Sequence, residues 1–306
     1  MSLSLSGRIL KEMINQQPGK IFLIINNYAG HQEGAKAVEI VVPLLQKNGC
    51  RVEYAFTQYA GHATELASKA SSEGFDLVVA VGGDGTVNET AQGLMGTNTS
   101  MGIIPVGSGN GLARELGISI NMHRSGLTLI KGTDLQIDVC RINSQRFLCT
   151  SGIGFDAQVA DQMSRASSRG FLRYIQLVIK ESILYKPLNV RMMIDGKAID
   201  QPAFLVTFAN ASQFGNNAFI APAASLSDGL IDVVVVRPFH KIWLPVFALA
   251  LFTKTINKLP FVDCYKARQI ELEWTDASIF HFDGEPGKLT VPATITLDEH
   301  KILVRR

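Results

Sequence analysis

The sequence predicts a two-domain protein: an α/β domain with a parallel sheet, followed by a mostly antiparallel β-sandwich domain. Three observations support this fold class. The chain has 306 residues, more than one small core needs. Short apolar runs alternate with helical patterns up to about residue 133, and many short strand patterns follow. Several strands of the first part run directly into glycine-rich turns.

In the first part, residues 1–133, strand and helix patterns alternate. The run LVVAV at 77–81 does not alternate between apolar and polar residues, which is typical of a strand buried on both faces. Strand–helix alternation implies right-handed crossovers, a parallel sheet, and ligand binding beyond the carboxyl ends of the strands. The expected strands are 20–26, 51–56, 77–81 and 101–105, and the expected helices are 35–47, 62–72 and 87–95.

The second part, residues 134–306, has a different pattern. The expected strands are 137–142, 147–153, 188–194, 204–209, 230–236 and 262–274, with shorter ones near Ile279, Ile295 and Ile302. The segment IDGKAID at 194–200 predicts a hairpin. Helices are expected at about 156–164, 171–184 and 241–255. Whether the last strand returns to the first domain is left open.

Composition excludes several functional classes. Lys and Arg number 29 against 27 Asp and Glu, a balance that argues against nucleic-acid binding. The four cysteines are scattered, which favours a reducing cytoplasm over a disulfide framework. The apolar segment 241–255 is too short to cross a bilayer and is predicted to be a buried helix rather than a lipid-docking surface.

The stretch VVAVGGDGTVNE leaves a buried strand through a turn typical of phosphate binding. Gly82, Gly83 and Gly85 let an anion approach the backbone amides at the start of a helix. Thr86 is placed to cap the helix or to donate to a phosphate. The carboxylate of Asp84 would repel phosphate unless it holds a metal or takes a proton. A tight turn with a capping Asp explains this stretch equally well.

A second turn, PVGSGNGLAREL, favours phosphate binding over a tight turn with a capping Asp. Gly107, Ser108 and Asn110 lie between the fourth expected strand and a helix that starts near Gly111. Ser108 and Asn110 can hydrogen-bond phosphate oxygens or a ribose. Two phosphate-type turns at one sheet edge favour a nucleotide site over a chance occurrence.

From residue 21 onward the chain resembles the diacylglycerol kinase catalytic-domain family, which includes bacterial diacylglycerol kinases, sphingosine kinases and ceramide kinases. The resemblance implies an N-terminal domain like that of NAD kinase and phosphofructokinase, and dependence on ATP and Mg²⁺. The motifs that carry it are IINNYAG, TQYAGHAT, GGDGTVNE, PVGSGNGLAR, SGIGFDAQV, APAASLSDGLIDV and FDGEP, in this order.

The resemblance also implies roles for individual residues. Asp84 matches an acid assigned to ATP–Mg²⁺ handling or to the general base, and Asp283 and Glu285 match the family's DGE motif, so three acids compete for the role of base. Asp156 matches a position near the polar head of the substrate. With the two turns included, the predicted nucleotide site comprises Asn26, Thr57, Gly82, Gly83, Asp84, Gly85, Thr86, Asn88, Glu89, Gly107, Ser108 and Asn110.

The segment SLSDGL matches a structural magnesium site in the family, which would use the Asp228 carboxylate and the carbonyls of Ser225 and Leu230. From the residues alone, a simple turn that closes a loop is the favoured interpretation.

These observations predict a cytoplasmic, peripheral lipid kinase that uses ATP and Mg²⁺ on a diacylglycerol-like or sphingoid lipid at a membrane surface. The form GSGNGLA favours a sphingoid base as the substrate. Two alternatives remain: an NAD kinase, which shares GGDGT, and a non-catalytic nucleotide- or lipid-binding regulator. The oligomeric state is open, with a homodimer among the alternatives.

Overall fold

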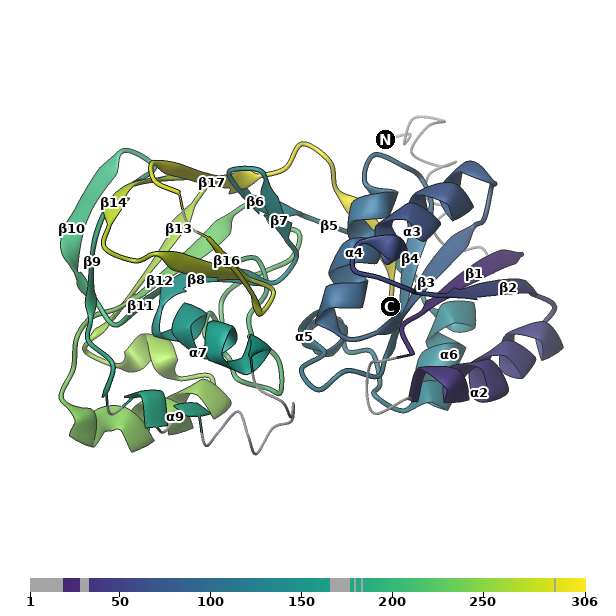
Figure 1. Cartoon of the computed structure of the whole chain (residues 1–306), viewed down its shortest axis with the longest axis horizontal. Coiled ribbons are helices and arrows are strands. Elements are labelled where there is room, and N and C mark those ends of the chain that lie inside the picture. The colour runs from purple at the N-terminus through teal and green to yellow at the C-terminus, as the bar shows by residue number, and fades with distance from the viewer. Residues whose placement is uncertain (1–18, 28–32, 166–176, 179, 183, 289) are drawn as a thin grey trace, which may run out of the picture. The chain divides into compact units, whose positions relative to one another are not determined.

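The computed structural model describes residues 19–27, 33–165, 177–178, 180–182, 184–288 and 290–306. It forms two compact units: the chain up to Ile137 together with His300–Arg306, and the chain from Asp138 to Glu299 (Figure 1). The sequence placed the division after residue 133. Both the α/β unit and the antiparallel β-sandwich unit that the sequence predicted are present.

The first unit is built on a six-stranded sheet with the order β2-β1-β3-β4-β18-β5. All neighbours are parallel except β18 and β5, which are antiparallel. The last strand of the chain therefore completes the first sheet. The strands are β1 (Lys20–Ile25), β2 (Arg51–Phe56), β3 (Leu77–Gly82), β4 (Ser100–Pro105), β5 (Asp134–Ile137) and β18 (Ile302–Arg305).

A buried ion pair fixes β18 beside β5. The Arg305 guanidinium contacts both carboxylate oxygens of Asp134, at 2.7 Å and 3.0 Å. Both side chains are less than a tenth exposed. The Ser100 hydroxyl of β4 donates to the same carboxylate at 2.7 Å. This bidentate geometry specifies the register of the last strand more sharply than apolar packing alone would.

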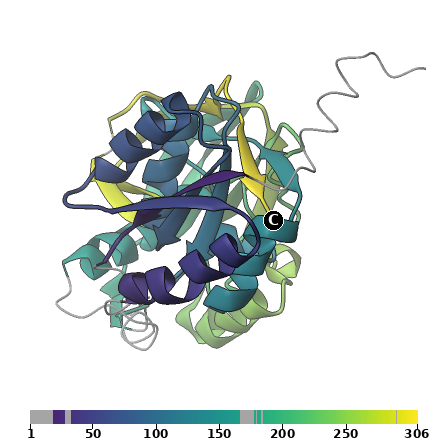
Figure 2. The same cartoon turned by 90° about the vertical axis from the view of Figure 1, so that its right-hand side faces the viewer.

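Helices cover both faces of this sheet (Figure 2). In the first unit they are α2 (Glu33–Lys47), α3 (His62–Ser72), α4 (Asp84–Leu94), α5 (Gly111–Glu115) and α6 (Met122–Lys131). Apolar residues of α2 and α6 pack with β1 and β3 in one core cluster, and α3 packs against α4. The sequence analysis missed α6, which begins after Asn121, a residue that caps the helix by accepting the Arg124 N–H.

The second unit is a sandwich of two antiparallel sheets that share a core of apolar residues. One sheet has the order β10-β9-β14-β17-β6-β7 and the other β13-β12-β11-β8-β15-β16. The strands of the first are β6 (Cys140–Ile142), β7 (Gln145–Phe147), β9 (Leu188–Ile194), β10 (Lys197–Ala203), β14 (Gln269–Thr275) and β17 (Ala293–Leu297). Those of the second are β8 (Thr150–Gly154), β11 (Leu205–Ala209), β12 (Ile231–Val236), β13 (Val262–Ala267), β15 (Ile279–Phe282) and β16 (Glu285–Lys288).

Three predicted strands were wrong in extent, because each is divided between two sheets or by a turn. They are 137–142, 147–153 and 262–274. In the last, the Asp195 carboxylate accepts the N–H groups of Arg268 and Gln269, so the chain turns between β13 and β14. The predicted hairpin at 194–200 is confirmed as β9–β10.

Helical segments cover the outer face of the second of these sheets. They are α7 (Phe155–Ser164), the short 3-10 helix η2 (Lys241–Trp243), α9 (Leu244–Phe252) and η3 (Ile256–Lys258). The expectation of a buried helix at 241–255 was wrong in one respect, because only one side of α9 is buried. The helix expected at 171–184 lies largely outside the described residues.

Candidate active site

Both glycine-rich turns lie at one edge of the first sheet. β3 and β4 are parallel neighbours, with Gly82 opposite Pro105 at their carboxyl ends. The N–H of Val106 also donates to the Gly82 carbonyl, at 3.1 Å. The turn after β3 leads into α4 and the turn after β4 leads into α5. Two predicted parts of the nucleotide site, distant in sequence, are therefore adjacent in the fold.

The two turns approach each other so closely that side chains do not fit between them. A Cβ atom on Gly107 would lie 2.5 Å from the Cα of Gly83, and one on Gly83 would lie 3.3 Å from the Cα of Gly107. A Cβ on Gly82 would overlap the side chain of Thr86. These glycines are needed for the close contact of two backbone segments.

Asp84 joins the first turn to the second. Its carboxylate accepts the N–H of Asn110 at 2.9 Å and the N–H of Gly111 at 2.6 Å. These amides lie at the start of α5, where helical N–H groups lack partners within the helix. Hydrogen bonds to a carboxylate are charge-assisted and stabilise its ionised form. The Asp84 carboxylate therefore positions the second turn.

Asn110 shapes the second turn from within. Its backbone is left-handed, with φ of 53°. Its side-chain amide donates to the Gly107 carbonyl at 2.7 Å and accepts the Gly107 N–H at 3.0 Å. Ser108 lies between these two residues and is exposed. In this turn, Ser108 presents its side chain to solvent, whereas the Asn110 side chain serves the turn itself.

The remaining predicted nucleotide residues of the first unit follow the same sheet edge or line α4. Asn26 and Thr57 come directly after β1 and β2. The Asn26 amide donates to the Thr86 hydroxyl at 3.1 Å, which ties the end of β1 to the first turn of α4. Asn88 and Glu89 serve helix contacts: the Asn88 oxygen accepts from Gln92 and the Glu89 carboxylate from the Ala63 N–H.

In the second unit, the acid of the DGE motif is held by three backbone amides. The Asp283 carboxylate accepts the N–H groups of Leu148 at 2.8 Å, Cys149 at 2.7 Å and Thr150 at 3.1 Å. Its backbone is left-handed, with φ of 48°, in the turn between β15 and β16. The three hydrogen bonds fix the carboxylate in one orientation. Glu285 begins β16 and is exposed.

Asp156, the predicted substrate residue, lies in the first turn of α7 in a nearly buried polar cluster. One carboxylate oxygen lies 3.0 Å from the Thr207 hydroxyl and 3.2 Å from His281 Nε2. The side chains of Asp156 and His281 are 9% and 4% exposed. The other imidazole nitrogen of His281, Nδ1, is buried and has no hydrogen-bond partner among the described residues.

The sequence analysis missed His281 and Thr207. The one signal for His281 was its nearness in sequence to the DGE motif, since it lies on β15 and Asp283 lies in the turn that follows. Thr207 carries no such signal. It reaches Asp156 only because β11 and β8 are paired, with Thr207 opposite Gly152.

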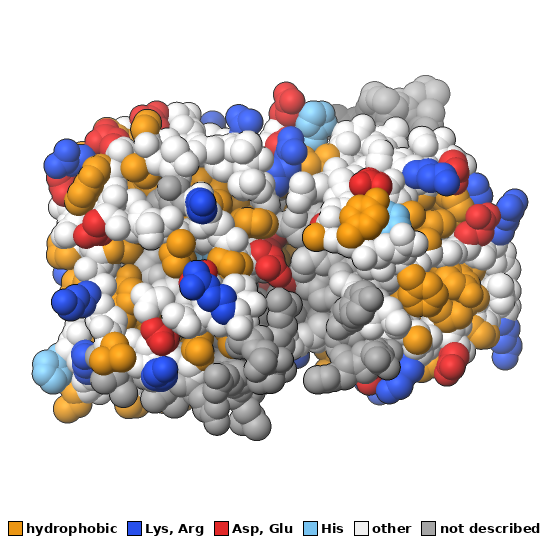
Figure 3. Space-filling view, viewed as in Figure 1, with side chains coloured by type: hydrophobic (Ala, Val, Ile, Leu, Met, Phe, Trp, Pro, Cys, Tyr) orange, Lys and Arg blue, Asp and Glu red, His pale blue; other side chains and the backbone are white. Residues whose placement is uncertain are grey.

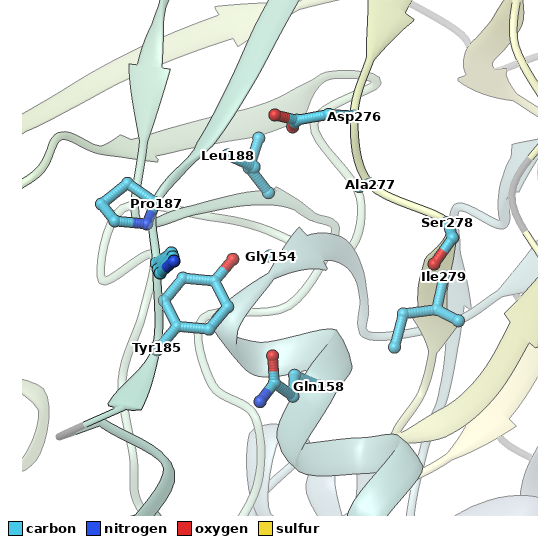
Figure 4. Close-up of a pocket in the computed structure, with 10 residues that line it drawn as sticks. Gly154, Gln158, Tyr185, Pro187, Leu188, Asp276, Ala277, Ser278 and Ile279 are labelled. Atoms are coloured by element: carbon cyan, nitrogen blue, oxygen red, sulfur yellow. The ribbon is translucent and has the colours of Figure 1, made fainter.

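A cavity of about 430 Å³, open to solvent, lies beside this cluster in the second unit (Figure 4). Gly154 of β8 and Gln158 of α7 line it, Leu188 and Ile279 add apolar surface, and Lys186 and Asp276 add charged groups. The ring of Tyr185 also lines it. Burial raises the pKa of the Tyr185 hydroxyl well above its usual value, and the nearby charges of Asp156 and Asp276 raise it further. The cavity therefore combines apolar walls with a neutral hydroxyl.

The predicted structural magnesium site is associated with a lysine. The Lys266 ammonium contacts the Asp228 carboxylate at 2.8 Å, the Asp232 carboxylate at 3.1 Å and the Ala223 carbonyl at 3.2 Å. Burial opposes the charge of Lys266, but the hydrogen bonds to both carboxylates outweigh burial and raise its pKa. One of the predicted magnesium ligands, the Asp228 carboxylate, is therefore paired with the Lys266 ammonium.

Ser225 and Leu230, the other two predicted magnesium ligands, flank the turn that contains Asp228, and the Leu230 N–H donates to the Asp228 carboxylate. Within the described ranges, no group of three or more His, Cys, Asp or Glu side chains is arranged to hold a metal ion. In the same ranges, no helix is long and apolar enough to span a lipid bilayer.

An α/β unit with two glycine-rich phosphate-type turns, joined to a β-sandwich unit with an amide-held acid, defines a kinase-like class of protein. Comparison with known proteins places the chain within that class. Residues 20–142 match the diacylglycerol kinase catalytic domain, and residues 150–304 match the YegS C-terminal NAD kinase beta sandwich-like domain. The chain belongs to the diacylglycerol kinase catalytic-domain family, as the motifs had indicated.

Relatives match over most of their length. Proteins named diacylglycerol kinase from Mycobacterium tuberculosis and Bacillus subtilis are each 29% identical, covering 87% and 91% of this chain and 89% and 93% of their own. A probable YegS-like lipid kinase from Chromohalobacter salexigens is 27% identical, covering 89% of this chain and 88% of its own. The crystal structure of a putative diacylglycerol kinase from Bacillus anthracis superimposes with a TM-score of 0.80, at 26% identity, over 95% of this chain and 96% of that one.

Proposed function

We propose that this protein is a lipid kinase that transfers the γ-phosphate of ATP, with Mg²⁺, to a hydroxyl of a diacylglycerol-like or sphingoid lipid. The observation that carries the proposal is the contact between the two glycine turns, held together by Asp84. Phosphoryl transfer depends mainly on positioning and on charge stabilisation, and this arrangement supplies fixed amides for the phosphates.

The donor side of the reaction belongs to the first unit. The ATP phosphates bind at the two glycine turns, which the contact between Gly83 and Gly107 holds side by side. Exposed Ser108 supplies a hydroxyl to the same phosphates. Mg²⁺ bound with ATP would neutralise the charge of the phosphates. The side chain of Asp84 organises this site before ATP binds.

The acceptor side belongs to the second unit. Asp283 accepts the proton of the lipid hydroxyl, a role that suits an ionised carboxylate fixed by three amides. Asp156 hydrogen-bonds the polar head of the lipid, with its orientation fixed by His281 and Thr207. The cavity beside α7 accommodates the apolar part next to the head, since Leu188 and Ile279 line it.

Two other activities are compatible with parts of the molecule. An NAD kinase would share the first turn and the sandwich. A non-catalytic nucleotide-binding regulator would keep the glycine turns. The presence of Asp84, Asp283 and Glu285 favours catalysis over regulation, because a binding module does not need the three acids together.

The test is phosphate transfer from labelled ATP to a panel of acceptors. Diacylglycerol, monoacylglycerol, sphingosine, ceramide and phosphatidylglycerol are presented in mixed micelles, and NAD is presented in solution. Asp283→Asn and Glu285→Gln are assayed beside the wild-type chain. We expect one lipid class to be labelled, Asp283→Asn to lower kcat by roughly 10²–10³, and Glu285→Gln to lower it less.

Labelling of NAD alone would replace the proposal with the NAD kinase alternative. ATP binding without labelling of any acceptor would favour the alternative of a non-catalytic regulator. A larger loss of kcat in Glu285→Gln than in Asp283→Asn would transfer the role of proton acceptor to Glu285.

A further inference from the structure

The helix α9 carries a row of exposed apolar side chains, which we call the α9 face: Ile242, Trp243, Val246, Leu249 and Phe252. The exposed fractions of Ile242 and Leu249 are 74% and 63%. The five residues recur at helical spacing along η2 and α9. Figure 3 shows hydrophobic and basic side chains at the lower left of the molecule, where α9 lies in Figure 1.

The opposite side of α9 is firmly packed, so the exposed face has a fixed orientation. Phe247 and Ala250 are buried in the core cluster outside the second sandwich sheet. The Phe247 ring stacks on Phe239, with centroids 5.5 Å apart, and Phe239 stacks on Phe261 at 4.4 Å. The core side of α9 is thus packed against aromatic rings, and of the α9 face Trp243 also contacts that core, through an edge-to-face contact with Phe261 at 6.0 Å.

The charged residues within the segment that carries the α9 face are all positive. No Asp or Glu occurs between Arg237 and Val262. Lys241 precedes α9, and Lys254 and Lys258 follow it. The Lys254 ammonium lies over the Phe219 ring, 4.2 Å from its centroid, and Arg237 pairs with Asp263 beyond the segment. Apolar side chains with a tryptophan among them, flanked by lysines, are typical of helices that lie in the plane of a membrane interface.

We propose that the α9 face docks this protein onto bilayers that contain anionic phospholipid. The apolar side chains enter the boundary between headgroups and acyl chains, while the three lysines contact the anionic headgroups. The inference rests on the proposed function, because a kinase with a lipid acceptor must reach a bilayer.

The charges near the α9 face favour a bilayer over a second copy of the chain as its binding partner. In a symmetric dimer the same patch meets itself, so antiparallel α9 helices would bring Lys241 of one copy toward Lys254 and Lys258 of the other. Like charges across such an interface are unfavourable. An anionic surface attracts all three lysines, and it can cover the apolar row at the same time.

The experiment is co-sedimentation of the full chain with vesicles of phosphatidylcholine alone or of phosphatidylcholine with phosphatidylglycerol. Leu249→Asp tests the apolar row, and Ile120→Asp is its matched control, since Ile120 is 59% exposed and lies in the first unit. We expect binding to the mixed vesicles, a loss of roughly tenfold or more in Leu249→Asp, and no change in Ile120→Asp. Lys254→Gln and Lys258→Gln should each weaken partitioning about fivefold.

A second measurement separates docking from catalysis. Phosphate transfer to a short-chain acceptor, dissolved below its micelle concentration, should be equal in Leu249→Asp and wild type. Vesicle binding without any kinase activity would support docking through the α9 face and would overturn the proposed function. Equal vesicle binding by Leu249→Asp and wild type, or no binding by wild type, would overturn the α9 face even in an active kinase. A change from dimer to monomer in Leu249→Asp, measured by light scattering, would overturn it in favour of self-association.

Discussion

The backbone N–H of Gly111 donates to the carboxylate of Asp84 over 2.6 Å, from the second glycine turn to the first. Together with the bond from Asn110, it makes one rigid element of two segments that follow different strands. An acid beside a phosphate-type turn is therefore not an anomaly in this protein. Its charge is directed at backbone amides, which explains how a carboxylate can lie beside such a turn.

The Asp84→Asn substitution tests this role. The amide keeps one acceptor oxygen but loses the charge and the second acceptor, so one N–H at the start of α5 loses its partner. Hydrogen bonds to charged groups contribute about 1.5–3 kcal/mol, and we expect a loss of stability near the lower value. ATP binding should weaken in parallel. Urea unfolding and calorimetric titration with ATP measure the two effects.

Glu65→Gln is the matched control for Asp84→Asn, because the Glu65 carboxylate accepts a hydrogen bond from Tyr59 at the surface. Its stability should change by less than about 0.5 kcal/mol. Equal stability of the two variants would contradict the role of Asp84 in holding the two turns together.

The Gly107→Ala substitution tests the contact between the turns. The new methyl group would meet the Cα of Gly83 at 2.5 Å, so the turns must separate, at a cost of about 1–3 kcal/mol. We expect ATP affinity to fall at least tenfold, measured by fluorescent-nucleotide displacement. In Gly19→Ala, the control, a methyl group would lie 3.4 Å from the nearest atom, an Asp76 oxygen. Unchanged affinity in Gly107→Ala would show that phosphate does not bind there.

His281→Asn tests whether the imidazole positions Asp156. The shorter amide cannot reach the Asp156 oxygen along the same path, so only Thr207 and the Ala157 N–H would still orient the carboxylate. We expect kcat/KM for the lipid acceptor to fall about tenfold while KM for ATP stays constant. His123→Asn, at an exposed site on α6, should alter neither. A parallel rise in KM for ATP would indicate general structural damage instead.

Lys266→Met tests whether the Lys266 ammonium, and not a metal ion, is the cation between Asp228 and Asp232. Removal of the ammonium leaves two carboxylates together, one of them only 8% exposed. Because Lys266 itself is 39% exposed, solvent screening limits the loss to about 1–2 kcal/mol. Added Mg²⁺ should then raise the Tm of the variant and leave that of the wild type unchanged.

The control for Lys266→Met is Lys36→Met, which removes a surface pair with Glu33 and should show no response to Mg²⁺. If Mg²⁺ raised the Tm of the wild type as much as that of Lys266→Met, the oxygens around Asp228 would be a metal site after all.

The fold was largely predictable because apolar runs and glycine turns are local signals. The pattern at Leu77–Gly82 reflects burial on both faces, and Asp195–Gly196 has the left-handed backbone that a tight hairpin needs. Division of strands was not predictable. Asp195 ends a strand by bonding to Arg268, far along the chain, and no local pattern records that contact.

The site was predictable at the level of position but not of contact. The motifs placed Asp84 and Asp283 correctly on turns. Whether such a carboxylate faces a ligand or a row of backbone amides depends on the packing of distant segments. Lys266 shows the same limit, since its charge reaches Asp228 only because β12 and β13 are paired.

The place of β18 in the first sheet has a consequence for how the chain is made. A ribosome releases the whole sandwich unit before Ile302–Arg305 emerge, so the nascent first unit presents an open, apolar edge at β4 throughout that interval. The first unit, although its synthesis begins first, is therefore completed last, when Arg305 reaches Asp134.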